Sequence, residues 1–303
     1  MKSVYTKVNT RYMNLLTDFG FHKIFGEESN KDLLLDFLNR IIKDEGLITS
    51  VQLLPSEQFG DFETDRKAVF DIFCETEKGE YIIVEMQKAQ QPFFFERCIF
   101  YASRVIQKQA PKGVWDFNFN KVYLIAILDF KLYDDLEADK EFFVERMKLY
   151  NERTKTASSD KLEFAFIELP KFNKTEEELK TGFDIWLFIL KNMHSLKACP
   201  VSIQGEIFDK LFDLAELKKL TKDEMEKYNK SVSEYYDVQL CMNFAAKKGI
   251  EQGIEKGRQE GFEESKTAII KKSIQMNLPL NVIIELTGYT EEQILRIKNM
   301  MSN

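Results

Sequence analysis

The sequence predicts an α/β domain followed by an all-helical C-terminal region. Two segments rich in β-branched and aromatic residues, 67–75 and 81–87, are joined by a short turn and indicate a β-hairpin. A fully apolar run at 122–128 is typical of a strand buried on both faces. From residue 171 onward, apolar residues recur at three- and four-residue intervals, which indicates helices.

The first predicted elements are a helix and a strand. Asn30 is the predicted N-cap of a helix over residues 31–43, and residues 48–54 predict a short strand that ends at Pro55. Five apolar residues fall on one face of this helix: Leu34, Phe37, Leu38, Ile41 and Ile42. The helix is therefore predicted to be amphipathic.

The remaining elements of the α/β domain follow the hairpin, whose turn lies at residues 77–80. Pro92 opens a predicted helix that runs to about Gln109, ahead of the buried strand. The resulting order is helix, strand, strand, strand, helix, strand (αβββαβ), an α/β arrangement. One more strand is expected at 164–169, closed by Pro170.

Helix start and stop signals divide the C-terminal half. Capping boxes at 175–178 and 221–224 each predict the start of a helix. A third helix between them is marked by Phe208, Leu211, Phe212 and Ala215. Near the end of the chain, one short helix should follow Pro279 and end at Gly288, and another should begin with the capping box 290–293.

Four glycines recur every fourth residue: Gly249, Gly253, Gly257 and Gly261. This period keeps them on one stripe of a helix, and each glycine costs ~1 kcal/mol relative to alanine. Two interpretations are open: a weakly ordered, solvated linker helix, or a close helix–helix contact that forms a homodimer through residues 245–265.

These patterns predict three regions. Residues 1–170 form the α/β domain, residues 171–240 form a helical region packed on its core, and residues 241–303 contain the glycine-repeat helix and a small helical pair.

The composition excludes some classes of protein. With 44% hydrophobic and 31% charged residues, the chain is expected to be globular and soluble. It contains no apolar stretch of the ~20 residues that a transmembrane helix needs, and no apolar secretory signal begins it. Four scattered cysteines then predict a reducing, cytoplasmic location. The net charge of −7 argues against a broadly basic nucleic-acid-binding surface.

The candidate catalytic residues lie on the hairpin. Asp71 on one strand can stand beside Glu85 on the other, and Gln87 shares a strand face with Glu85. Two acids among apolar neighbours are costly unless a cation or hydrogen bonds compensate them. Their oxygen ligands suit Mg²⁺, with Mn²⁺ as an alternative, and such an ion can activate water for phosphodiester hydrolysis.

A stripe of cationic residues follows the hairpin. Arg97, Tyr101, Arg104 and Lys108 are spaced by four, three and four residues, so they share one helix face. The stripe either contacts DNA phosphates or is an ordinary solvated helix face.

These residues resemble the Rpn family of recombination-promoting nucleases and transposases, within the PD-(D/E)XK nuclease superfamily. The matching stretches are TDFGFHKIFG, NKDLLLDFLNRII, DRKAVFDIFCETEKGEYIIVEMQKAQQPFFFERCIFYASR, KVYLIAILDF and LPKFNKTEEELKTGFDIWLFILKN, and VEMQKA is the most specific part. The resemblance implies a restriction-endonuclease-like core, Mg²⁺-dependent DNA cleavage, and a role in recombination or transposition. By motif position, Asp71 matches the first acid, Glu85 the second, and Gln87 the place of the lysine.

Glutamine at position 87 is a departure from the superfamily pattern, because it cannot carry the charge of lysine. Lys67 shares the strand parity of Asp71 but lies too far along the strand to replace it. The resemblance also implies an acid on the first helix, for which Asp18 is the candidate. The alternative function is a catalytically silent nuclease fold that binds DNA or a protein partner.

Overall fold

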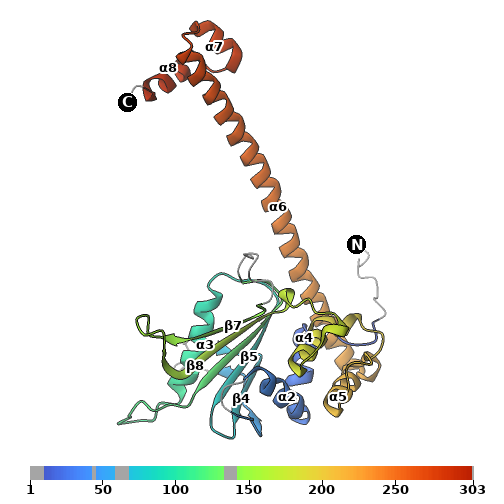
Figure 1. The fold of residues 1–303 in the computed structure, drawn as a ribbon. Helices are drawn as coiled ribbons and strands as arrows, with labels where there is room; N and C mark the ends of the chain where they lie inside the picture. Colours follow the sequence, from blue (N-terminus) through green and yellow to red (C-terminus); the bar gives the residue numbers. More distant parts are fainter. Residues whose placement is uncertain (1–9, 43–45, 59–67, 133–141, 302–303) are drawn as a thin grey trace. The chain divides into compact units, whose positions relative to one another are not determined.

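The computed structural model describes residues 10–42, 46–58, 68–132 and 142–301 (Figure 1). Contacts divide the chain into two units, Met1–Gln239 and Leu240–Asn303. Each unit is described by itself. None of the helices in the described ranges is long and apolar enough to cross a membrane.

The first unit contains a six-stranded sheet with the strand order β1-β4-β5-β6-β8-β7. The strands are β1 (Val51–Leu53), β4 (Ile72–Thr76), β5 (Tyr81–Gln87), β6 (Val122–Leu128), β7 (Val144–Tyr150) and β8 (Ala157–Glu168). β1, β4 and β5 pair antiparallel, β6 is parallel to β5 and to β8, and β7 is antiparallel to β8.

Helices cover both faces of this sheet. The helices of the first unit are α1 (Asp18–Phe25), α2 (Lys31–Ile41), α3 (Phe94–Lys108), α4 (Gly182–Asn192), α5 (Glu206–Ala215) and the start of α6 (Lys222–Gln275). α3 packs on one face, against Phe73, Ile83 and Leu124. The other face, with Ile82 and Val84, packs against α1, α2, α4 and α5, of which α2, α4 and α5 lie together in Figure 1. The predicted αβββαβ order is confirmed, as α1/α2, β1, β4, β5, α3 and β6.

The prediction of one continuous strand over residues 67–75 is wrong. The strand breaks at Phe70 and Asp71, and its first part, β3 (Ala68–Val69), pairs with β2 (Glu57–Gln58) in a separate ribbon. Phe70 and Phe73 both enter the core beneath α3, with ring centroids 5.3 Å apart. In a regular strand, positions three apart face opposite sides, so the chain must bend between them.

The C-terminal end of the sheet is larger than predicted. β8 begins at Ala157 instead of residue 164, and its partner β7 was not expected. β7 contains Glu145, Arg146 and Lys148, whose charges hide its strand pattern. Arg146 and Lys148 each lie 3.2 Å from a carboxylate oxygen of Glu163, a buried acid of β8.

Two predicted helix starts also need correction. Asn30 is the N-cap residue of α2 but makes no capping hydrogen bond: its Oδ1 accepts from the Ser29 hydroxyl (3.4 Å), and its Nδ2 donates to the carbonyl oxygen of Lys23 (2.9 Å). The capping box at Thr175 opens only a short 3₁₀ turn, Glu176–Glu178, and α4 begins at Gly182 behind a second box formed by Thr181 and Asp184. The box at Thr221 does open α6.

In the second unit, the end of α6 packs with α7 (Leu280–Thr287) and α8 (Glu291–Met300) around Ile270, Ile283 and Ile294. Both predicted boundaries of α7 are confirmed, since Pro279 precedes it and Gly288 ends it at φ 72°. The capping box at Thr290 opens α8 as expected.

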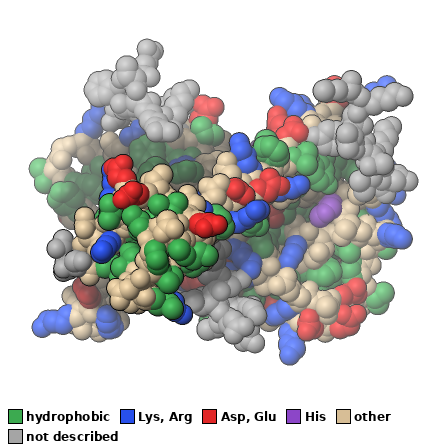
Figure 2. Space-filling view, turned by 90° about the horizontal axis from the view of Figure 1, so that it is seen from above, with side chains coloured by type: hydrophobic (Ala, Val, Ile, Leu, Met, Phe, Trp, Pro, Cys, Tyr) green, Lys and Arg blue, Asp and Glu red, His purple; other side chains and the backbone are tan. Residues whose placement is uncertain are grey.

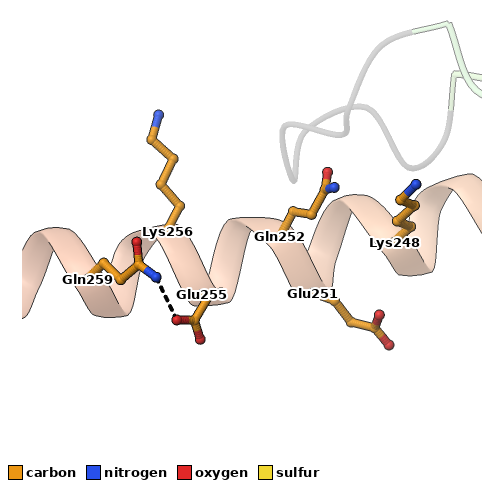
Figure 3. A pocket seen from close by; sticks show the side chains of 6 residues that line it. All are labelled: Lys248, Glu251, Gln252, Glu255, Lys256 and Gln259. Atoms are coloured by element: carbon orange, nitrogen blue, oxygen red, sulfur yellow. Dashed lines mark hydrogen bonds between the residues drawn. The ribbon is translucent and has the colours of Figure 1, made fainter.

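The four repeated glycines lie within α6. Among the described residues, no atom lies within 4 Å of a Cβ built on any of them. The side chains in Figure 3, from Lys248 to Gln259, all belong to this one helix and spread outward from it. A single helix cannot enclose a ligand, so this surface is not a candidate site.

Candidate functional site

The two candidate acids meet where the hairpin strands end. β4 and β5 pair Ile72 with Val84, and the next pair in this register is Asp71 with Glu85. The Asp71 N–H donates to Oε1 of Glu85 (3.3 Å), and the Met86 N–H donates to Oδ2 of Asp71 (2.7 Å). The bend after Phe70 frees the Asp71 side chain to lie across the strand end. Each carboxylate therefore accepts a hydrogen bond from the backbone of the partner strand, and that the two acids share a metal ion stays a prediction.

The surroundings of these acids favour their protonated forms. Glu85 is 7% exposed, and its burial raises its pKa to about 8, with the negative charge of Asp71 acting in the same direction. Asp71 is exposed at the rim of the site, but the protein around its carboxylate still raises its pKa. The N–H of Met86 opposes this shift, and the charge of Asp18 adds to it. The pair thus needs a proton or a cation.

Gln87 lies on the same strand face as Glu85 but its amide is already engaged. Its Oε1 accepts a hydrogen bond from Nη2 of Arg97, and its Nε2 donates to the carbonyl oxygen of Ala89 (3.1 Å). The Arg97 guanidinium also lies over the rings of Phe94 and Tyr101, at 5.3 and 5.9 Å. Its positive charge lowers the pKa of both Asp71 and Glu85. Gln87 therefore holds a cation beside the acids without carrying a charge itself.

The three cations of the predicted α3 stripe make different contacts. Arg97 reaches inward to Gln87, whereas Arg104 donates to Gln107 (2.9 Å) and lies 6.0 Å from the ring of Phe100. Lys108 lies 5.9 Å from the ring of Phe73. Phosphate contacts by Arg97, Arg104 and Lys108 stay a prediction, and of the three Arg97 is the one that bonds a candidate site residue.

Asp18 lies in a cavity of about 220 Å³ together with Asp71. The other lining residues are Phe21, His22, Ser56, Phe70 and Met86. Asp18 is the first residue of α1, whose N-cap is the side chain of Thr17. The structure therefore brings Asp18 close to Asp71, and its role in the site stays a prediction.

Lys88 is a residue of this site that the sequence analysis missed. Its Nζ lies 2.6 Å from Oδ1 of Asp18, and its charge lowers the pKa of Asp71. It was overlooked because it lies one residue past the motif position and on the strand face opposite Gln87. Lys88 shares a strand face with Met86, and Met86 packs in the core that contains α1. This alternation could have predicted that Lys88 points toward α1. Lys67, considered earlier, lies outside the described residues.

A profile described as PD-(D/E)XK nuclease family transposase matches residues 15–245. The chain belongs to this family. No curated protein and no solved structure matches the chain. The matched residues of this PD-(D/E)XK transposase-family chain run from α1 into α6, and they contain every candidate site residue.

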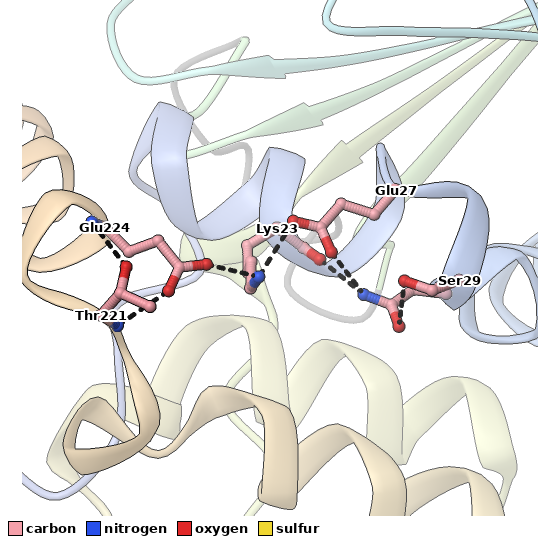
Figure 4. Close-up of polar contacts among 6 residues, drawn as sticks. Lys23, Glu27, Ser29, Thr221 and Glu224 are labelled. Atoms are coloured by element: carbon pink, nitrogen blue, oxygen red, sulfur yellow. Dashed lines mark hydrogen bonds and ion pairs between the residues drawn. The ribbon is translucent and has the colours of Figure 1, made fainter.

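In this PD-(D/E)XK protein, the start of α6 holds the elements that carry the site. Lys23 of α1 bonds Glu224 (2.8 Å) and Glu27 (3.0 Å), as Figure 4 shows. The Phe19 N–H, next to Asp18, donates to Oγ of Ser231 (3.1 Å). α1 is therefore fixed at both of its ends.

The same helix face also holds the ends of β5 and β6. The Tyr235 hydroxyl donates to Oδ2 of Asp129 (2.6 Å), and Nε2 of Gln239 donates to Asp129 (3.2 Å) and to the carbonyl oxygen of Lys88 (3.4 Å). Asp129 in turn donates its N–H to the carbonyl oxygen of Gln87 (3.0 Å). These bonds fix the strand ends beside the acids.

PD-(D/E)XK nucleases generally use divalent metals, and the residues present fit such an ion. Within the described ranges, no group of three or more His, Cys, Asp or Glu side chains is placed to hold a metal. Mg²⁺ however is commonly bound by one or two carboxylates and several waters. Glu85, buried beside a second acid with a raised pKa, is the kind of donor whose charge such an ion would neutralise.

Proposed function

We propose that this protein is a metal-dependent DNA endonuclease that hydrolyses phosphodiester bonds, with a role in DNA recombination or transposition. The observation that carries the proposal is the buried carboxylate of Glu85, which accepts a hydrogen bond from the Asp71 N–H and lies beside the Asp71 side chain. Family membership supports a nuclease or transposase-like activity.

Asp71 and Glu85 are the residues that would hold the ion, Mg²⁺ or Mn²⁺. When bound, the ion supplies a polarised water and stabilises charge on the phosphate. Arg97 favours the ionised form of both acids, since its charge lowers the pKa of each. Gln87 positions Arg97 through its side-chain oxygen.

DNA is the proposed substrate and must be bound by a local surface. The net charge is −7, and in Figure 2 acidic, basic and hydrophobic side chains are interspersed over the face that is visible. Nonspecific affinity for DNA comes from Lys and Arg contacts with phosphates. Arg104 and Lys108 of α3 are the proposed contacts outside the cavity.

The test is cleavage of supercoiled plasmid by the full chain with Mg²⁺, with Mn²⁺ and with EDTA. Cleavage should need the divalent ion, and Asp71→Ala and Glu85→Gln should abolish it. Glu75→Gln makes the same chemical change on β4 of the hairpin, away from the acid pair, and should leave cleavage unchanged. Equal cleavage by the wild type and Glu85→Gln would exclude Glu85 as a metal ligand.

The second candidate function is a catalytically silent nuclease fold that binds DNA or a protein partner. Gln87 favours it, since this residue supplies no charge where the superfamily has lysine. A gel-shift assay separates the two candidates, because the silent protein would bind plasmid with Mg²⁺ present and leave it supercoiled.

A homodimer through residues 245–265 and a cytoplasmic location remain predictions. Ile250, Ile254 and Phe262, each next to a glycine of the repeat, are 60–66% exposed. Burial of these side chains against a second copy would offset the glycine cost. A dimer would bring the two active sites that a double-strand cut requires.

A further inference from the structure

Lys88 is a cation that forms an ion pair with Asp18, which lines the same cavity as Asp71. Its side chain is only 13% exposed, and its Nζ lies 2.6 Å from Oδ1 of Asp18. An ammonium group has three N–H donors, so an ion pair with one carboxylate oxygen leaves it able to donate again. Its positive charge also lowers the pKa of Asp71, which lines the cavity beside Asp18.

The other polar groups around the acids are less suited to contact a substrate. Gln87 is uncharged, and both ends of its amide are engaged, by Arg97 and by Ala89. Arg97 donates hydrogen bonds to Gln87 and Gln91, and its guanidinium lies over the rings of Phe94 and Tyr101. Lys88 instead pairs with Asp18, and Asp18 and Met86 both line the cavity.

We infer that Lys88 supplies the positive charge that Gln87 cannot, as a catalytic residue that donates a hydrogen bond to the scissile phosphate. This inference rests on the proposed nuclease function. In the reaction, the water oxygen bonds to phosphorus and the bond from phosphorus to the leaving sugar oxygen breaks. One water proton ends on the leaving oxygen, and the other is lost from the product phosphate to solvent. Negative charge that develops on the phosphate oxygens faces the Lys88 ammonium, which stabilises it.

A purely structural role for Lys88 is the competing explanation, since its pair with Asp18 ties β5 to α1. The two roles differ in what the loss of each partner does. A structural ion pair is lost equally whether Lys88 or Asp18 is neutralised. A contact with the phosphate is lost only when Lys88 is changed.

The experiment compares the full-length variants Lys88→Gln, Asp18→Asn and their double variant. The single-turnover cleavage rate is measured at saturating plasmid and Mg²⁺, with thermal unfolding and Mg²⁺ binding by calorimetry measured on each protein. Lys88→Gln should cleave ~100-fold more slowly than the wild type, the order of the loss when one charge-stabilising donor is removed. It should keep Mg²⁺ binding, and Asp18→Asn should lose less than ~10-fold in rate.

Two further variants complete the design. Lys23→Gln neutralises another ion-paired lysine that contacts α1 and should cleave within ~3-fold of the wild type. Lys88→Arg keeps a cation beside Asp18, so it separates the loss of the charge from a loss of folding. It should cleave at least ~10-fold faster than Lys88→Gln.

Equal losses in Lys88→Gln and Asp18→Asn, with no further loss in the double variant, would overturn the inference in favour of the structural ion pair. A wild-type rate in Lys88→Gln, or no gain from Lys88→Arg, would overturn it too. Failure of the nuclease proposal looks different, because the wild type itself would then not cleave DNA with any divalent ion.

Discussion

Glu85→Gln should change how the stability of the metal-free protein depends on pH. The pKa of Glu85 rises from 4.5 to about 8 on folding, because the side chain is buried beside Asp71. Between these two values the folded protein holds a proton that the unfolded chain has released. The stabilising contribution of the Glu85 proton is therefore fully present below pH 4.5 and is lost as pH rises through 8.

The size of the effect follows from the shift. Each pKa unit corresponds to 1.36 kcal/mol, so ionisation of Glu85 should cost the folded wild type roughly 5 kcal/mol between pH 4.5 and pH 9. That is comparable with the whole stability of many domains, 5–15 kcal/mol. Glutamine cannot ionise, so the variant should avoid this loss and be the more stable protein at pH 9.

The assay is urea unfolding in EDTA at pH 5 and pH 9, for the wild type, Glu85→Gln and the control Glu75→Gln. The control should lose stability with pH as the wild type does. Addition of Mg²⁺ should then stabilise the wild type and the control but not Glu85→Gln, because only proteins that bind the ion gain from it. If all three proteins lose the same stability between pH 5 and pH 9, Glu85 is already ionised in the folded state and the reasoning is refuted.

The remaining predictions concern cleavage, assembly and the α6 contacts. Gln87→Lys restores the superfamily pattern, but it removes the acceptor of Arg97 and sets two cations together, so plasmid cleavage should fall at least ~10-fold; an unchanged rate would show that the Gln87–Arg97 bond has no role. EDTA should abolish cleavage by the wild type, and excess Mg²⁺ should restore it, as measured on the same plasmid. Light scattering should find the full chain dimeric at micromolar concentration and Ile254→Glu monomeric; if both are monomers, the glycine repeat is a spacer. Tyr235→Phe removes a hydrogen bond to the Asp129 carboxylate and should lower the free energy of unfolding by about 1–3 kcal/mol; urea unfolding with no change would contradict the anchoring of the strand ends.

Elements whose pattern of apolar residues lies within one segment of the chain were predictable from the sequence. The buried strand β6 and the hairpin strand β5 follow from periodicity alone, and the hairpin register predicts that Asp71 and Glu85 are neighbours. The helices near the chain end were equally accessible, since their caps are local signals.

Features that depend on distant packing were not predictable in this way. The bend at Phe70 exists because α3 offers a core site to both Phe70 and Phe73. Arg97 reaches Gln87 because α3 packs on that face of the sheet, against β6. Lys88 is positioned by its ion pair with Asp18, seventy residues earlier in the sequence. β7 depends on Glu163 of β8 to compensate its cations. Such contacts leave no periodic trace in a single segment.

The contacts of α6 with the elements of the candidate site limit how far the chain can be truncated. A fragment that ends at residue 170 would keep every residue proposed for chemistry. It would nevertheless strip partners from the Asn14 and Phe19 N–H groups and from the Asp129 carboxylate. Where such groups stay buried, each unpaired one costs about 1–3 kcal/mol. It would also uncover Phe25 and Phe37, whose rings lie 5.5 Å from Trp186 of α4. The smallest fragment that keeps these partners runs to Gln239, so sequence changes that leave the site intact should concentrate after that residue.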